Sequence, residues 1–343
     1  MRVVVDDKIP YIREALSAMG VDAVYAPGSH INNALVRDAD ALIIRTRTRC
    51  DAALLQDSRV QFVATATIGY DHIDTAYCAA QGIRWTNAPG CNAASVRQYV
   101  QSVLLLLQKE RGIQLSGSTI GVVGVGHVGT LVADMAATWG MRVLLCDPPR
   151  AERGEQGFVS LQAIAHEADI ITLHTPLTHE GPHRTWHLAD EAFFECLQRK
   201  PYFINTSRGE TTDTKALLQA LDEGRIAQCI IDVWEHEPRI DLRLLEHCYI
   251  GTPHIAGYSA DGKANATRMS LEALSSHFGL GEVPTIVPPA PDKTIPQAAS
   301  RAEALLHIYS PHTDSNALKL HPEDFELLRG NYPLRREETA YTI

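Results

Sequence analysis

The stretch Thr119–Pro148 has the sequence TIGVVGVGHVGTLVADMAATWGMRVLLCDP and predicts the central unit of the chain. Residues 119–123 form a short β-branched run that is typical of a buried strand, and a helical pattern follows it. A second apolar run at 142–146 predicts another strand, which ends at Asp147. Strand, helix and strand in this order predict a βαβ unit, the building block of a doubly wound parallel sheet.

Three glycines with the spacing G-x-G-x-x-G join the first strand to the helix, namely Gly124, Gly126 and Gly129. Gly124 would allow a sharp turn, Gly126 would let backbone amides reach a pyrophosphate, and Gly129 would let the helix pack closely on the strand. The free N–H groups at the start of the helix would face the phosphates. Together with the acidic Asp147, the spacing predicts a dinucleotide site, with a plain glycine-rich turn as the alternative.

Length, charge and cysteine usage set the broad class of the protein. The 343 residues suffice for about two or three domains. The formal net charge of −10 argues against nucleic acid or an anionic membrane as the main partner. The seven cysteines are scattered and never form a C-x-x-C pair, and no signal peptide or membrane-spanning run is evident. These features predict a soluble cytoplasmic protein.

Strand and helix patterns alternate in two regions, which predicts an α/β fold with two doubly wound parallel-sheet domains. A flavodoxin-like substrate-binding domain is expected at residues 1–95, completed by residues 256–280. A Rossmann-type NAD-binding domain with about six parallel strands is expected at residues 96–255. The remaining expected strands and helices are 2–5, 10–19, 41–44, 61–65, 73–81, 84–86, 93–110, 170–174, 202–205, 214–223, 227–232 and 261–278.

Three polar residues lie just beyond expected strand ends of the NAD-binding region, where open α/β sheets bind their ligands: Arg208, Glu237 and His254. A histidine, with a typical pKa near ~6.5, suits the removal of a hydroxyl proton, and a carboxylate beside it would orient the ring. A guanidinium would hold a substrate carboxylate in a two-pronged contact. Taken singly, each residue has an ordinary alternative as a loop, ion-pair or turn residue. Their joint placement after the dinucleotide motif favours catalysis.

These motifs resemble those of the D-2-hydroxyacid dehydrogenases. The resemblance is carried by GVGHVG (124–129), SRG (207–209), DVWEHEP (232–238) and TPHIAGYS (252–259). It implies that His254 is the acid/base, Glu237 its partner and Arg208 the substrate clamp, with the nicotinamide in a cleft between the two domains. The implied cofactor is NAD, because Asp147 would bind the adenosine ribose hydroxyls and repel the extra phosphate of NADP, although Arg150 nearby would suit NADP.

Further positions are assigned to ligands by the same resemblance and by the residues themselves. The expected cofactor-binding residues are Gly124, Gly126, His127, Val128, Gly129, Asp147, Thr175, Ser207, Asp232 and Gly257. The expected substrate-binding residues are Arg45, Thr46, Thr67, Gly69 and Tyr258. No metal is expected, since hydride transfer to nicotinamide needs none, and proline and glycine interrupt the histidine-rich run 174–187.

The run 42–49, LIIRTRTR, is a candidate site for a substrate phosphate. If a strand continued through it, period-two alternation would place Arg45, Arg47 and Arg49 on one side. Arg45 and Thr46 are the preferred phosphate ligands, whereas solvated arginines are the alternative for the other two. In the loop TIGY (67–70), glycine would let backbone N–H groups approach the substrate carboxylate.

Longer segments extend the resemblance to family members that oxidise 4-phospho-D-erythronate in pyridoxal 5′-phosphate biosynthesis. They are TATIGYDHID (65–74), HTPLTHEGPHRTWHLAD (174–190) and GYSADGKA (257–264). The expected reaction is therefore NAD-dependent oxidation to (R)-3-hydroxy-2-oxo-4-phosphooxybutanoate. The motif NYPLRREE (331–338) implies a small C-terminal dimerisation domain at 281–343 and hence a homodimer. The alternatives are a phosphoglycerate or hydroxypyruvate/glyoxylate reductase of the same family, or a non-enzymatic NAD-sensing binding protein.

Overall fold

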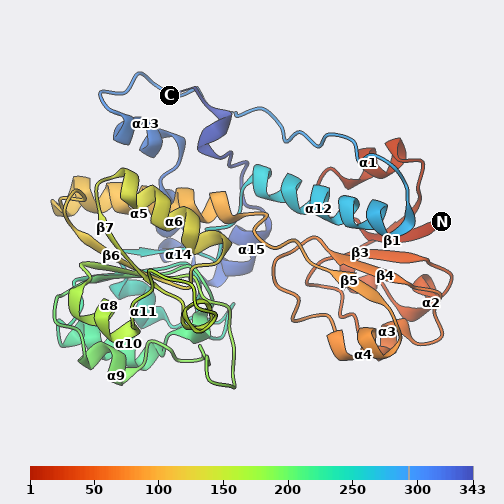
Figure 1. Ribbon diagram of the computed structural model, residues 1–343. Helices are drawn as coiled ribbons and strands as arrows, with labels where there is room; N and C mark the ends of the chain where they lie inside the picture. The colour runs from red at the N-terminus through yellow and green to blue at the C-terminus, as the bar shows by residue number, and fades with distance from the viewer. Residues whose placement is uncertain (293, 343) are drawn as a thin grey trace. The chain divides into compact units, whose positions relative to one another are not determined.

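The computed structural model describes residues 1–292 and 294–342, which separate into two compact units. Unit 1 comprises Met1–Asn92 with Ser259–Ala290, and unit 2 comprises Ala93–Tyr258 with the described part of Pro291–Ile343. Each unit contains one parallel β-sheet with helices on both of its faces (Figure 1). The prediction of an α/β fold with two doubly wound parallel sheets is confirmed.

Unit 1 has a five-stranded sheet in the order β2-β1-β3-β4-β5, which is the flavodoxin-like order. Its strands are β1 (Arg2–Asp6), β2 (Asp22–Ala26), β3 (Ala41–Ile44), β4 (Phe62–Thr65) and β5 (Arg84–Thr86). Successive side chains enter opposite cores: Val3 and Val5 pack with α1 (Ile12–Ala18) and α12 (Ala260–Phe278). Val4 packs toward the opposite face, against α2 (Asn33–Val36), α3 (Ala52–Leu55) and α4 (Thr75–Ala80). Burial on both faces explains why the strands are almost wholly apolar.

Unit 2 has a six-stranded sheet in the order β11-β10-β9-β8-β6-β7. Its strands are β6 (Thr119–Val123), β7 (Arg142–Cys146), β8 (Ile170–Leu173), β9 (Tyr202–Asn205), β10 (Gln228–Ile231) and β11 (Ile250–Gly251). Beyond β7, Phe158 forms a single parallel bridge with Leu145, so that the usual third strand of a Rossmann sheet is reduced to one residue. The register pairs Val122 with Thr172 and Leu145, which places the strand ends along one edge.

Helices cover both faces of this sheet (Figure 1). One face packs against α5 (Ala93–Arg111) and α6 (His127–Thr138). The other packs against α8 (Leu161–Glu167), α9 (Glu191–Glu195), α10 (Thr214–Asp222) and α11 (Leu242–His247). The short α7 (Pro148–Glu152) follows β7 directly.

The C-terminal segment of unit 2 contains α13 (Arg301–Ile308), α14 (Pro311–Leu320) and α15 (Phe325–Gly330). Helix α14 lies against the edge strand β11, where the N–H of Gly251 donates to the Ser315 hydroxyl at 3.1 Å. Leu318 joins the core beneath the sheet, and Leu305 joins the core beneath α5. The segment therefore covers an edge that would otherwise expose unpaired backbone groups.

Most expected elements are found within one or two residues, including the strand expected at 41–44, but strand β2 was missed. Its sequence DAVYA is short, and in the structure it is only partly buried. Strand β3 ends at Ile44 and does not continue through Arg45 to Arg49, so of the two possibilities for this run the strand end is found. A turn follows β3, closed by the Thr48 N–H on Arg45 O at 3.0 Å and by the Thr48 hydroxyl on Gly28 O at 2.9 Å. The arginines of this run therefore do not alternate along a strand.

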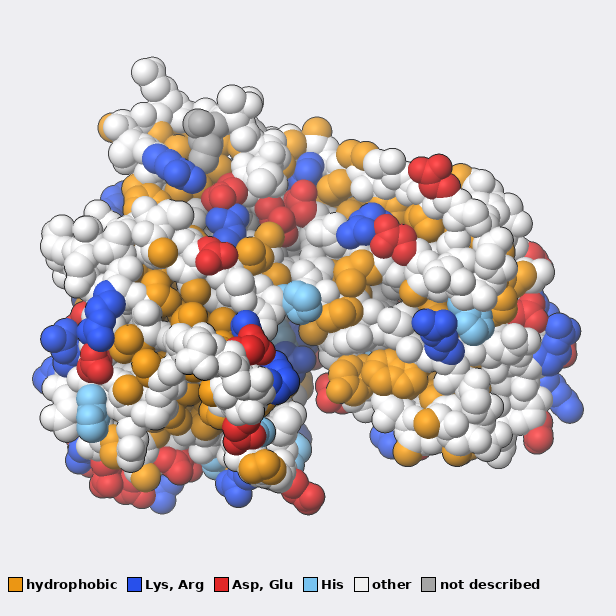
Figure 2. All heavy atoms as spheres, in the orientation of Figure 1, with side chains coloured by type: hydrophobic (Ala, Val, Ile, Leu, Met, Phe, Trp, Pro, Cys, Tyr) orange, Lys and Arg blue, Asp and Glu red, His pale blue; other side chains and the backbone are white. Residues whose placement is uncertain are grey.

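Charged side chains of both signs are interspersed on the face of the molecule that Figure 2 shows. Interspersed charge is typical of a surface that does not bind a polyanion. Among the helices of the described residues, none combines the length and the apolar character needed to cross a membrane.

Candidate active site

The order of the unit 2 sheet reverses between β6 and β8, because β7 lies on the outer side of β6. Open α/β sheets bind their ligands at such a switch point, beyond the carboxyl ends of the strands. Here the residues that follow β6 are Gly124–His127, and those that follow β8 are His174 and Thr175. The sequence motif and the topology therefore point to the same place.

The three glycines of the motif have three different surroundings. Gly124 has a φ of +86°, and a Cβ on it would lie 2.8 Å from the backbone of His174 and Thr175. A Cβ on Gly129 would lie 2.0 Å from Gly124 O, so that only glycine allows α6 to approach the turn. A Cβ on Gly126 would meet no protein atom within 4 Å. Gly124 and Gly129 are thus required by the fold, whereas Gly126 leaves open space at the start of α6.

This difference predicts opposite outcomes for two alanine variants. Gly129→Ala should destabilise the protein by about 1–3 kcal/mol, because its methyl group overlaps a backbone carbonyl. Gly126→Ala should leave the melting temperature unchanged but weaken NAD binding, because its methyl group would occupy the open space before α6. Thermal unfolding and NAD titration of both variants check this pair. Equal loss of stability in the two variants would contradict the assignment.

Asp147 lies at the end of β7 and links the two βα turns. One carboxylate oxygen accepts the Val125 N–H at 2.8 Å, and the other caps α7 by accepting the Arg150 N–H at 3.1 Å. The Arg150 guanidinium is held by Glu155 at 2.6 Å and donates to Val125 O at 2.6 Å. The cation that would suit the extra phosphate of NADP is therefore paired with a carboxylate, and each Asp147 oxygen retains a lone pair for a ribose hydroxyl.

Beyond β8, His174 and Thr175 differ in how their polar atoms are satisfied. His174 lies between the hydroxyls of Thr172 and Thr206, at 3.0 and 3.2 Å, and burial lowers its pKa to about 3. It therefore stays neutral and acts as a structural group. The Thr175 hydroxyl oxygen is buried and has no partner among the described residues. A buried hydroxyl without a partner at the switch point fits a ligand that would supply the missing hydrogen bond.

His254 and Glu237 form a direct pair. The imidazole Nδ1 lies 2.8 Å from Glu237 Oε2, and the other carboxylate oxygen accepts the Trp234 N–H at 3.0 Å. Both side chains are partly exposed, at 27% for His254 and 20% for Glu237. With Nδ1 held by the carboxylate, Nε2 is the ring nitrogen left to exchange a proton with a ligand.

The backbone of His254 is held in an unusual conformation. Its φ of +56° is in the left-handed region, which non-glycine residues adopt mainly where the surroundings fix them. The His254 N–H donates to Asp232 O at 2.8 Å, and the buried Asp232 carboxylate accepts the N–H groups of Ile255 and Ala256 and the Thr252 hydroxyl. Burial raises the pKa of Asp232, while His254 and these donors oppose the rise. Asp232 was expected at the cofactor, and in the structure its side chain holds the histidine loop.

Arg208 follows β9, the neighbour of β10, and its loop is also tightly held. The Asn205 amide donates to Arg208 O at 3.0 Å and to the hydroxyls of Thr211 and Thr212. A Cβ on Gly209 would lie 2.0 Å from the Trp234 carbonyl, so this loop packs directly on the one that carries Glu237. The Arg208 guanidinium donates to Ser207 O at 2.8 Å and has no carboxylate partner among the described residues. Its positive charge is thus available to an anionic ligand.

The three candidate catalytic residues therefore follow three adjacent parallel strands, β9, β10 and β11, at one edge of the sheet.

Comparison with known proteins agrees with this assignment. Residues 93–256 match the family model described as "D-isomer specific 2-hydroxyacid dehydrogenase, NAD binding domain". A curated erythronate-4-phosphate dehydrogenase of Bacteroides fragilis is 59% identical over 100% of this chain and 99% of its own length. The chain belongs to the D-2-hydroxyacid dehydrogenase family.

More distant members agree. An erythronate-4-phosphate dehydrogenase of Porphyromonas gingivalis is 44% identical over 100% of this chain and 95% of its own length. Among solved structures, the TT0316 protein of Thermus thermophilus superimposes with a TM-score of 0.67 at 28% identity, covering 81% of this chain and 97% of its own. The protein is accordingly an NAD-dependent dehydrogenase, and the residues at the switch point fit that cofactor.

In this family member, the other expected site residues are in varied surroundings. Gly126 and His127 are exposed at the start of α6 and Val128 is half-buried, whereas the Ser207 hydroxyl is buried and donates to Asn205 at 2.8 Å. Tyr258 packs edge-on against Tyr332, with ring centres 5.9 Å apart, and Gly257 beside it is half-buried.

In unit 1, Arg45 pairs with the buried Asp6 at 3.2 Å, and Thr46 in the turn beyond β3 is exposed. The Thr67 hydroxyl donates to Gly69 O at 2.8 Å and closes the loop that follows β4. The backbone N–H groups of Ile68 and Gly69 have no acceptor among the described residues. These donors remain available to an anion, as the sequence suggested.

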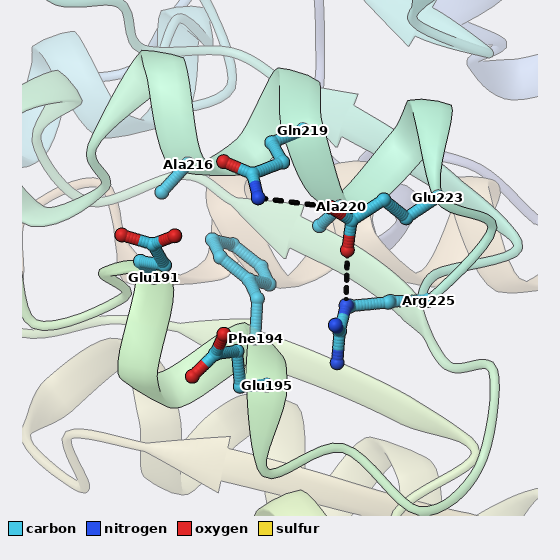
Figure 3. Close-up of a pocket in the computed structure, with 8 residues that line it drawn as sticks. All are labelled: Glu191, Phe194, Glu195, Ala216, Gln219, Ala220, Glu223 and Arg225. Carbon is cyan, nitrogen blue, oxygen red and sulfur yellow. Dashed lines mark hydrogen bonds and ion pairs between the residues drawn. The ribbon is translucent and has the colours of Figure 1, made fainter.

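The surface depression between α9 and α10 is a separate feature (Figure 3). Phe194 lies between the two helices, and Glu191, Glu195 and Glu223 surround it. Its one arginine, Arg225, is bound to Glu223. This acidic rim does not suit an anionic substrate, and none of the expected site residues lines it.

Sequence reasoning missed two residues that hold the site. Asn205 fixes the Arg208 loop, and its position as a polar residue at the end of the strand YFIN was an available signal. Arg335 contacts the His254 loop from the C-terminal segment, and only the resemblance of NYPLRREE to the family marked that region.

Proposed function

We propose that the protein oxidises the 2-hydroxyl of 4-phospho-D-erythronate with NAD, producing (R)-3-hydroxy-2-oxo-4-phosphooxybutanoate and NADH for pyridoxal 5′-phosphate biosynthesis. The observation that carries the proposal is the His254–Glu237 pair, together with an Arg208 that has no carboxylate partner among the described residues, in a chain 59% identical to a curated erythronate-4-phosphate dehydrogenase. Because the reaction removes a proton and a hydride from one carbinol group, it requires a base and a hydride acceptor together.

His254 is the base in this proposal. Nε2 accepts the hydroxyl proton, and the Glu237 carboxylate at Nδ1 stabilises the imidazolium that forms. The bound nicotinamide supplies the hydride acceptor. Arg208 holds the substrate carboxylate or the developing carbonyl oxygen, so that the 2-hydroxyl faces the imidazole.

Glu237 must be ionised for this role, and its surroundings keep it so. Burial by itself would raise the pKa of Glu237, but the hydrogen bond and charge of His254 and the N–H of Trp234 outweigh burial and lower it. A carboxyl group whose pKa is lowered by folding stabilises the native state above its unfolded pKa, near ~4.3. That stabilisation is lost as the pH falls through the lower pKa of the folded group.

Glu237→Gln tests this linkage. We expect the variant to be less stable than the native protein above about pH 5, and the difference to disappear as the pH falls below about 4. At neutral pH, kcat should fall roughly 100-fold, because the amide cannot stabilise an imidazolium as a carboxylate does. Thermal unfolding against pH and steady-state kinetics provide the two readouts. A stability difference that grew on acidification would refute the assignment.

The cofactor residues in this proposal are those of the switch point, with Asp147 at the adenosine ribose and Thr175 at the cofactor. Ser207, Asp232 and Gly257 are proposed at the cofactor as well, and the side chains of Asp232 and Ser207 also hold their loops. The substrate-binding residues are Arg45, Thr46, Thr67, Gly69 and Tyr258. Support in unit 1 comes from the N–H groups of Ile68 and Gly69, which have no acceptor among the described residues, and from Arg45, which pairs with Asp6 and could bind a phosphate in its place.

Substrate profiling tests the proposed function. The native enzyme should prefer 4-phospho-D-erythronate over the three-carbon 3-phospho-D-glycerate in kcat/KM by at least about 10-fold, since one missing carbinol group leaves donors unpaired. D-Erythronate without the phosphate should be the poorer substrate as well. A preference for the three-carbon phosphate would instead assign the protein to the phosphoglycerate branch of the family.

We further propose a cytoplasmic homodimer formed through the C-terminal domain, residues 281–343. Three of the exposed large apolar side chains lie in the portion of this region that belongs to unit 2: Leu320 (74%), Leu327 (56%) and Leu334 (36%). Exposed apolar side chains in one region indicate an interaction surface. Leu320→Glu with Leu327→Glu should convert a dimer to a monomer in sedimentation experiments, whereas the exposed Leu242→Glu should not. A native protein that sediments as a monomer would refute this assembly.

A further inference from the structure

Arg335 is a buried arginine that the proposed reaction does not use. Its side chain comes from the C-terminal segment of unit 2 and is 6% exposed. The guanidinium donates to Ala256 O at 2.5 Å, to Ile255 O at 3.4 Å and to the carbonyl and hydroxyl oxygens of Ser95 on α5. These contacts join three parts of the chain that are far apart in sequence: α5, the loop after His254, and the C-terminal segment.

The peptide units that follow His254 are consequently held from both sides. The carbonyl of Ile255 and the N–H of Ala256 belong to one peptide plane. Asp232 accepts the N–H of this plane at 3.0 Å, and Arg335 donates to its carbonyl. A peptide bound at both ends cannot rotate without breaking one contact. Because His254 has a left-handed backbone, its ring direction depends on this restraint.

The burial of Arg335 is costly and therefore informative. A buried cation is normally paired with a carboxylate, yet Arg335 forms no ion pair among the described residues. Its guanidinium instead lies over the Tyr309 ring at 4.3 Å and near the Tyr332 ring at 6.0 Å. The hydroxyls of both tyrosines donate to the Asp314 carboxylate, at 2.8 and 2.9 Å. The negative charge that balances Arg335 is thus that of Asp314, which lies behind the two tyrosines and does not contact the guanidinium. The guanidinium can therefore donate to the His254 loop.

We propose that Arg335 is a positioning residue for catalysis: it fixes the peptide between Ile255 and Ala256, one residue beyond His254, and thereby keeps the imidazole in line with Glu237. The inference rests on the proposed role of His254. It also implies that the C-terminal segment acts on the chemistry and not only on assembly.

Two variants of the full-length enzyme test the proposal. Arg335→Met keeps the length of the side chain and its stacking on the tyrosines but removes the donors. We expect kcat with 4-phospho-D-erythronate to fall about 100-fold, because a displacement of roughly 1 Å at the base suffices for such a loss. KM and the NAD dissociation constant should change less than about twofold, since neither ligand is bound by this group. Arg335→Lys keeps the positive charge but lacks the planar, forked set of donors of a guanidinium. Its kcat should lie between those of native enzyme and Arg335→Met.

The matched control is Arg97→Gln. Arg97 on α5 pairs with Glu338 at 2.8 Å and so anchors the same C-terminal segment, but it does not touch the His254 loop. Its kcat should remain within about twofold of native. If Arg97→Gln lost as much activity as Arg335→Met, loosening of the segment would explain the effect and the proposal would fail.

A spectroscopic readout separates this proposal from the proposed function. The hydrogen-bonded Nδ1 proton of His254 should give a downfield proton resonance, assigned by its loss in His254→Asn. We expect it in native enzyme and Arg97→Gln, and expect it broadened or shifted in Arg335→Met. An unchanged resonance together with native kcat would overturn the proposal, whichever substrate the enzyme oxidises. If Arg335→Met does not fold, the same comparison with Arg335→Lys decides.

In a Glu237→Gln background, Arg335→Met should reduce kcat much less than in native enzyme, because both residues act through His254. If the fold-loss of kcat in the double variant equalled the product of the two single-variant losses, Arg335 would act independently of His254.

Discussion

Replacement of His254 by asparagine is expected to lower kcat by about 1,000-fold while the protein stays folded and binds NAD. Asparagine is the informative substitution because His254 has a φ of +56°, a backbone conformation that asparagine tolerates better than alanine. The loop contacts to Asp232 come from the N–H groups of His254, Ile255 and Ala256 and from the Thr252 hydroxyl; none involves the His254 side chain, and all are retained. The missing function is then the transfer of the hydroxyl proton.

The matched control is His236→Asn in the same region. His236 also has a left-handed backbone, with a φ of +63°, but it is exposed and lies outside the pair with Glu237. Steady-state kinetics, NAD titration and thermal unfolding of the two variants give the comparison. If His254→Asn retained native kcat, another group would be the base; if both variants lost activity equally, backbone disturbance would be the cause.

Loss of the Arg208 guanidinium is the second large expected effect. Arg208→Gln should reduce kcat/KM by about 100- to 1,000-fold, because the substrate loses a charge-assisted donor in the transition state. Arg208→Lys should recover only part of the loss, since an ammonium group cannot make the same two-pronged contact. The φ of Arg208 is −140°, so neither substitution strains the backbone.

Arg243→Gln is the control for the loss of an arginine from unit 2. Arg243 pairs with Asp222 at 2.6 Å in an exposed position, and such pairs contribute about 1 kcal/mol or less. Its kcat/KM should be native. A product-release or stability effect of Arg208→Gln, seen as unchanged kcat/KM with a lower melting temperature, would contradict the assigned role.

The sequence predicted the part of the site that depends on local spacing. The turn from β6 into α6 and the acid at the end of β7 lie within 30 residues, and Gly124 and Gly129 each have a steric reason in the turn. Arg208, Glu237 and His254 could be named because the carboxyl ends of parallel strands meet at one edge of a sheet. The pairing of His254 with Glu237 then follows from the adjacency of β10 and β11.

Contacts between distant segments were not predictable in the same way. Nothing local in NYPLRREE shows that Arg335 reaches the loop after His254, because Arg335 and Ala256 lie 79 residues apart in the sequence. For LIIRTRTR, alternation of the arginines along a strand and a strand end with solvated arginines were both open from the sequence. A single buried hydroxyl, that of Thr48 on Gly28 O, favours a turn. Asp232 was expected at the cofactor, and the sequence did not show that its oxygens also accept the N–H groups of the loop after His254.

The most direct test of the account is NADH formation by the native enzyme from 4-phospho-D-erythronate, measured by absorbance. A parallel sample contains a 2-oxo acid, which reoxidises any NADH that stays bound to the enzyme. The account predicts turnover, a slower rate when deuterium replaces hydrogen at carbon 2, and deuterium in the NADH produced. Folded enzyme that binds NAD but forms no product from this substrate in either sample would contradict it.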